Sequence, residues 1–134
     1  MDILMLKSIL TTLVLLMAIL QALTMSQVKG RLRLVNLPSS QLRRFHKVEG
    51  DVALLFILVT AAICISQLSV TPREPRAVLH ALFGVSGVVT IVLKFAVARF
   101  FRPHLGYASY ISAVLFLSVL GIFVTSALWY FIAV

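Results

Sequence analysis

The sequence predicts an all-α fold, a bundle of four transmembrane helices in up-down-up-down order with both termini on the outer side. Hydrophobic residues make up 61% of the 134-residue chain, against roughly half of a soluble domain. Four apolar runs each supply about the 20 residues that a helix needs to cross the hydrocarbon core. The longest connection is too short and too basic to hold a second core. We therefore expect one integral membrane domain over residues 1–134.

The first helix is predicted at about residues 3–25. Its side chains are mostly aliphatic, and its few hydroxyl and amide groups can bond to their own backbone or bridge to a neighbouring helix. The run is long for a signal peptide, and no small-x-small cleavage site is associated with it. We expect it to be retained as a helix.

The second helix is predicted at about residues 50–68. The alternation of arginine and leucine over residues 31–34 suits a segment that lies along the lipid headgroups. A Pro-Ser-Ser turn at 38–40 then provides a serine N-cap. The helix is therefore expected to extend on the cytoplasmic side from about residue 41.

The third and fourth helices are predicted at about residues 77–98 and 107–134. The proline-rich turn 71–75 ends the second helix and starts the third. Pro103 ends the third helix, and His104 belongs to the entry of the fourth. Aromatic residues lie near both ends of the fourth helix, as is typical of membrane interfaces.

The positive charges predict the orientation of the bundle. Nine of the twelve Lys and Arg residues lie between the first two helices or toward the end of the third: Lys29, Arg31, Arg33, Arg43, Arg44, Lys47, Lys94, Arg99 and Arg102. By the positive-inside rule, loops 26–49 and 99–106 are cytoplasmic in a bacterial inner membrane. The basic residues of 29–47 are expected to contact anionic lipids. The net charge of +8 is thus explained without nucleic acid.

The three histidines, His46, His80 and His104, each lie at or near the end of an apolar run. Imidazoles are costly in hydrocarbon unless they are ligated or paired, so the pattern points to an intramembrane haem. Gly50 and Gly84 each follow a histidine by four residues. A glycine there makes room for the macrocycle.

His46 and His80 are not expected to share one haem, because their helices start on opposite sides of a bilayer about 30 Å thick. For His46 the partner at matching depth is His104, with Met25 as second choice. For His80 the candidates are the thioether of Met5 and, near the same depth, Cys64. As the single cysteine, Cys64 also excludes an intrachain disulfide.

Lys94 lies about four residues inside the end of the third helix, on the face of His80 and Gly84. It is expected to point into the bundle, toward Glu49, Asp51 or a cofactor. Other cations can snorkel or neutralise haem propionates. As an alternative to haem ligation, His46 and His104 would lie unligated in the hydrated headgroup zone. His80 would instead form a hydrogen bond to a backbone carbonyl of a neighbouring helix. The acidic residues 49 and 51 are expected to pair with Arg43, Arg44 or Lys47.

Four segments also match a known pattern. They are His46-Lys47-x-x-Gly50, Leu79-His80-Ala81-Leu82-Phe83-Gly84, the pair Lys94 and Arg99, and the closing run 125–131. They resemble a little-characterised bacterial family of four-helix membrane proteins that is similar to small b-type cytochromes. The resemblance covers about residues 42–131. It implies a haem-binding bundle associated with membrane electron transfer, with His46 and His80 at the family's positions. The chain departs from the family at Ile63, where members carry a further histidine, and His104 is an addition.

The sequence thus predicts a small cytochrome-like subunit that binds haem b and assists electron transfer within a larger respiratory or photosynthetic complex. It has no nucleophile-plus-base arrangement and no phosphate loop, so it is not expected to be an enzyme alone. The alternative is a non-redox accessory subunit that packs against other membrane subunits, pigments or lipids. A third interpretation is that His80 or His46 ligates the magnesium of a chlorophyll-type pigment.

Overall fold

The computed structural model describes residues 2–66 and 74–133. Three long helices come first: α1 (Ile3–Val28), α2 (Ser39–Ser66) and α3 (Pro75–Arg99). The fourth long segment is built from a 3₁₀ turn, η1 (Arg102–Tyr107), followed by α4 (Ala108–Phe123), a π-helical segment, η2 (Val124–Leu128), and α5 (Trp129–Ala133). The described residues contain no strand.

All four segments are long and apolar enough to cross a membrane. Their best 18-residue windows have a mean hydropathy between 2.1 and 2.4, and only 17–22% of each window is buried inside the bundle. Apolar surface of this extent suits contact with lipid. The predicted class, four apolar helices without strands, is confirmed.

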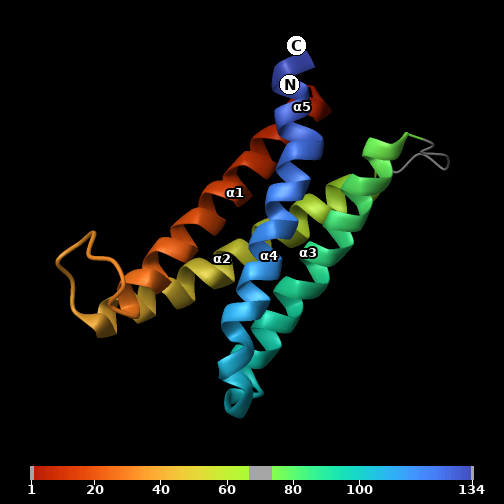
Figure 1. Cartoon of the computed structure of the whole chain (residues 1–134). Coiled ribbons are helices and arrows are strands. Elements are labelled where there is room, and N and C mark those ends of the chain that lie inside the picture. Colours follow the sequence, from red (N-terminus) through yellow and green to blue (C-terminus); the bar gives the residue numbers. More distant parts are fainter. Residues whose placement is uncertain (1, 67–73, 134) are drawn as a thin grey trace.

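The helices run back and forth, so that both chain ends lie at one end of the bundle (Figure 1). We call this the terminal end; it holds the start of α1 and helix α5. The other, which we call the basic end, holds the connection 29–38 and η1. At this end a hydrogen bond of 2.8 Å from Lys29 Nζ to Ser109 Oγ links the start of the 29–38 connection to the first turn of α4.

The core lies midway along the bundle and takes residues from all four helices: Val14, Ile57, Ile91, Leu115 and Val119. Helix α3 packs mainly on α4, and α1 packs on both α2 and α4. Gly121 of α4 faces Phe83 of α3. A Cβ atom there would lie 2.5 Å from Cγ of Phe83, so the phenyl ring occupies the space of the missing side chain.

The helix ends differ slightly from the prediction. Helix α1 continues to Val28, and α2 begins at Ser39 because the carbonyl of Pro38 accepts the first helical hydrogen bonds. Helix α3 begins at Pro75, within the predicted turn. Residues 71–73 of that turn, and the predicted end of the second helix at residues 67–68, lie outside the described residues.

Candidate functional site

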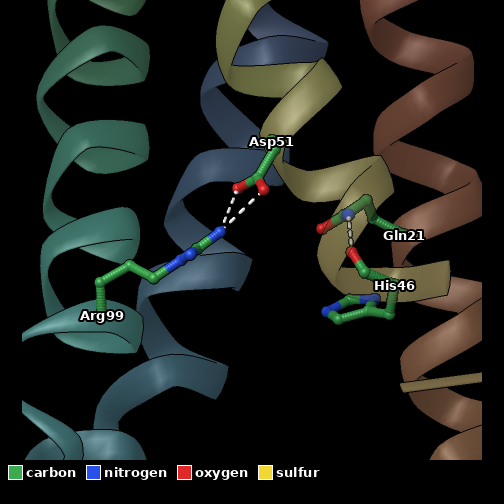
Figure 2. Close-up of polar contacts among 4 residues, drawn as sticks. All are labelled: Gln21, His46, Asp51 and Arg99. Carbon is green, nitrogen blue, oxygen red and sulfur yellow. Dashed lines mark hydrogen bonds and ion pairs between the residues drawn. The ribbon is translucent and has the colours of Figure 1, made fainter. Parts of the chain in front are cut away.

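His46 lies at the basic end, where α2 faces α1. Its Nδ1 atom is 3.1 Å from Oγ1 of Thr24, and its backbone oxygen accepts a hydrogen bond of 3.1 Å from Nε2 of Gln21 (Figure 2). The two α1 residues are three apart and therefore lie on one helix face. Because Nδ1 is engaged, Nε2 is the ring nitrogen that can bind an outside group.

A pocket of about 440 Å³ lies beside His46 and is lined by Met25, Val28, Lys29, Arg43 and His46. Its lining therefore combines a histidine and a methionine with two basic residues. Of the two partners proposed from the sequence, Met25 shares this pocket, whereas His104 does not line it.

Gly50 serves a different purpose from the predicted one. A Cβ atom at this position would lie 3.3 Å from Nε2 of Gln21. The space beside the glycine is therefore taken by the amide of Gln21, which reaches the carbonyl of His46 through it. Gly50 makes room for a protein side chain rather than for a macrocycle.

Lys94 points into the bundle, as predicted. Its ammonium donates a hydrogen bond of 3.0 Å to Oε1 of Gln21. The same amide thus accepts from α3 and donates to α2, so that three helices meet at one side chain. The charged group that acts on Lys94 is the carboxyl of Glu49.

Glu49 is only 7% exposed. Its Oε2 atom lies 3.4 Å from the hydroxyl of Thr24, and its Oε1 atom has no hydrogen-bond partner within the described part of the chain. A buried carboxyl oxygen without a partner is costly. Glu49 and Lys94 are two ionisable groups that lie inside the bundle and both contact the polar residues of α1. Ionisable groups at such positions often mark function in membrane proteins.

Asp51 lies at the same level but faces α3. Arg99 Nη2 donates to both of its carboxylate oxygens, at 3.0 and 2.7 Å (Figure 2). The expected pairing of Asp51 with Arg43, Arg44 or Lys47 is therefore wrong. Those cations lie on α2 itself, and Asp51 points away from them toward the neighbouring helix.

A second polar group, near the terminal end, surrounds His80. The Nδ1 atom of His80 lies 3.0 Å from Oγ1 of Thr125, and Arg76 donates a hydrogen bond of 3.2 Å to the backbone oxygen of Thr125. Thr125 belongs to the π-helical segment η2. Such segments are frequent at functional sites because they release backbone groups from the helical ladder. The guanidinium of Arg76 also lies 5.2 Å from the ring centre of Trp129.

Gly84 leaves open space beside His80, because a Cβ atom there would meet nothing within 4 Å. Lys7 is a charged neighbour of both His80 and Cys64. Met5 is 45% exposed on α1. It therefore lies on the outer surface of the bundle.

His104 is exposed on η1, and its ring centre lies 6.2 Å from that of Tyr107. The described residues contain no group of three or more His, Cys, Asp or Glu side chains that could hold a metal ion.

One family model, described as "Family of unknown function (DUF6529)", matches residues 1–134. The chain belongs to this family. No curated protein and no solved structure gives a significant match.

The residues of the basic-end pocket fit a haem in their chemistry. A histidine and a methionine are an established axial pair, and the free Nε2 of His46 is the atom that would bind iron. Lys29 and Arg43 match the negative propionates. At the terminal end, His80 lies beside the open side of Gly84 and would offer one imidazole donor.

The sequence analysis missed Thr24 and Gln21 as partners of His46. Their signal was the polar pair three residues apart in an otherwise aliphatic helix. It also missed the π-helical segment around Thr125. That segment lies within a continuous apolar run, in which one extra residue per turn leaves no mark on composition.

Proposed function

We propose that this chain is a small cytochrome-like subunit of a bacterial inner membrane. It binds haem b and assists electron transfer within a larger respiratory or photosynthetic complex. It is not an enzyme by itself, and its partners are the other membrane subunits of that complex.

The observation that carries this proposal is the pocket shared by His46 and Met25. Haem supplies reversible one-electron oxidation and reduction when it is bound. The chain's own residues would bind the haem and orient the His46 ring. Thr24 fixes the His46 ring by holding Nδ1, which leaves Nε2 as the ring nitrogen that would bind iron. Lys29 and Arg43 supply positive charge at its rim.

We also propose an orientation of the bundle in the membrane. Loops 26–49 and 99–106 hold most of the positive charge, so the basic end is cytoplasmic and both termini face outward. The pocket of His46 then lies at the cytoplasmic interface, where a soluble donor or a neighbouring subunit can reach it.

A non-redox accessory subunit is the second candidate. It is favoured by the threonine hydroxyls that already contact both interior histidines, at 3.1 Å for His46 and 3.0 Å for His80. A histidine that is hydrogen-bonded in this way needs no metal. A chlorophyll-type pigment is the related possibility, since it needs a single imidazole and His80 lies beside open space at Gly84.

The test is a reduced-minus-oxidised visible spectrum of the purified full chain, with the haem content measured on the same sample. A b-type band that is lost or shifted in both Met25→Leu and His46→Ala, and retained in His104→Ala, supports the haem site. A flat spectrum from well-folded protein overturns it. A far-red absorption that His80→Ala removes would instead assign a pigment.

A further inference from the structure

The connection between α1 and α2 forms a second pocket, of about 510 Å³, at the basic end. Its lining includes Arg31 and Arg33, and none of the lining residues is acidic. The connection is held in shape at both ends. The backbone N–H of Arg31 donates to the carbonyl of Ser26 at 2.9 Å, and the amide of Gln27 donates to the carbonyl of Val35.

The start of α2 adds to the positive character of this pocket. Ser39, the first residue of the 28-residue helix, is among the lining residues. The first turn of a helix leaves backbone N–H groups unpaired, and the helix dipole favours an anion there. Two arginines and the start of a helix therefore border one pocket.

Apolar side chains lie directly beside these charges. Leu32, Leu34, Val35 and Leu37 are all between 41% and 57% exposed, although they lie outside the four membrane-spanning helices. Exposed leucines next to arginines are unfavourable against water alone but suit the boundary between headgroups and acyl chains.

We propose that this pocket binds one anionic phospholipid, with its phosphate held by Arg31, Arg33 and the start of α2. The acyl chains lie against the exposed leucines of the connection. The basic residues of the 29–47 region thus have separate roles. Lys29 and Arg43 line the neighbouring pocket, whereas Arg44 and Lys47 are exposed on α2 and line neither of the two pockets.

Binding of a lipid at a specific site differs from general attraction of the chain to a negative membrane. Two matched double variants can separate these two effects. Arg31→Gln/Arg33→Gln and Arg44→Gln/Lys47→Gln each remove two positive charges from the same end. General attraction depends on charge near the surface, so it predicts equal losses. A site predicts a loss for the first pair alone.

The experiment measures phosphatidylglycerol bound to the purified full chain by native mass spectrometry, as the lipid is titrated into a neutral detergent. We expect one molecule of phosphatidylglycerol to bind to each chain, with a higher affinity than phosphatidylcholine has. Binding should be weaker by roughly 25-fold in Arg31→Gln/Arg33→Gln, about 1 kcal/mol for each arginine, and unchanged in Arg44→Gln/Lys47→Gln.

Three results overturn the proposal. Equal losses in the two double variants would leave only general attraction. Equal binding of phosphatidylcholine would remove the role of the phosphate's net charge. Displacement by glycerol phosphate at the same concentration as the lipid would assign the pocket to a free phosphate compound. Because none of these measurements involves haem, their outcome is separate from that of the electron-transfer proposal.

Discussion

Lys94 on α3 donates a hydrogen bond to the side-chain oxygen of Gln21 on α1, across 73 residues of sequence. The nitrogen of the same amide donates to the backbone of His46 on α2. One side chain therefore connects three helices at the level of the candidate site. The position of His46 depends on this amide, and the amide depends on Lys94.

Replacing Lys94 with methionine should destabilise the bundle. The substitution leaves Gln21 Oε1 without its donor and removes the cation that acts on the buried Glu49, so we expect a loss of about 1–3 kcal/mol. The measurement is the free energy of unfolding in mixed micelles as the denaturing detergent is increased. Lys47→Met, on the exposed face of α2, is the control and should change it by less than about 0.5 kcal/mol. Equal effects would argue against an interior role for Lys94.

Gly121→Ala should be destabilising and Gly84→Ala should not. The new Cβ at Gly121 would lie 2.5 Å from the ring of Phe83, and overpacking of this kind costs about 1–3 kcal/mol. The new Cβ at Gly84 meets nothing within 4 Å, so the better helix propensity of alanine should stabilise by up to about 1 kcal/mol. Thermal unfolding of both variants checks this, and Phe83→Ala should rescue Gly121→Ala.

Thr125→Val should reduce the stability of the bundle more than Ser126→Ala at the neighbouring position. The hydroxyl of Thr125 reaches His80 on another helix, whereas that of Ser126 donates only to Ile122 in its own segment. We expect a loss of about 1 kcal/mol for the first and a smaller one for the second. Nitrogen NMR of the His80 ring should also change in Thr125→Val alone. An unchanged ring spectrum would show that the two side chains are not bonded.

The ion pair of Arg99 with Asp51 should contribute little to stability. Both side chains are partly exposed, at 35% and 48%, and pairs of this kind contribute at most about 1 kcal/mol. A double-mutant cycle with Asp51→Asn and Arg99→Gln measures the coupling. The coupling energy should be smaller at high salt than at low salt, because exposed charges are screened. A coupling of several kcal/mol that does not respond to salt would contradict this.

The orientation can be tested with cysteines introduced singly at two exposed positions in a Cys64→Ala background. A thiol reagent that does not cross the membrane should label Glu74→Cys on intact cells, and Arg44→Cys only after lysis. Position 74 adjoins the start of α3, and position 44 lies near the basic end. The opposite labelling pattern would invert the bundle and place the His46 pocket outside.

Hydropathy alone was sufficient to predict the four helices, because lipid exposure requires long apolar runs whatever their packing. The ends of α1 and α2 were displaced by two or three residues, since caps and backbone hydrogen bonds, not hydropathy, decide where a helix stops. The π-helical segment could not be predicted, because it changes the backbone ladder and leaves the composition as it is.

The site was predicted in part. The interior direction of Lys94 followed from its depth in the third helix. The partners did not follow, because they depend on the rotation of each helix about its axis. Asp51 was assigned to cations on its own helix and pairs with Arg99 on α3 instead. In a lipid-exposed helix nearly every face is apolar, so the pattern carries little information on rotation.

The contact between Gly50 and Gln21 should couple the evolution of these two positions. A methyl group at position 50 would push against the amide nitrogen that holds His46, so the two positions are not free to change independently. Relatives in which position 50 carries a side chain should have a shorter residue than glutamine at position 21. In such relatives the lysine at position 94 would lose its acceptor as well, so a change at one glycine should be accompanied by changes on two other helices.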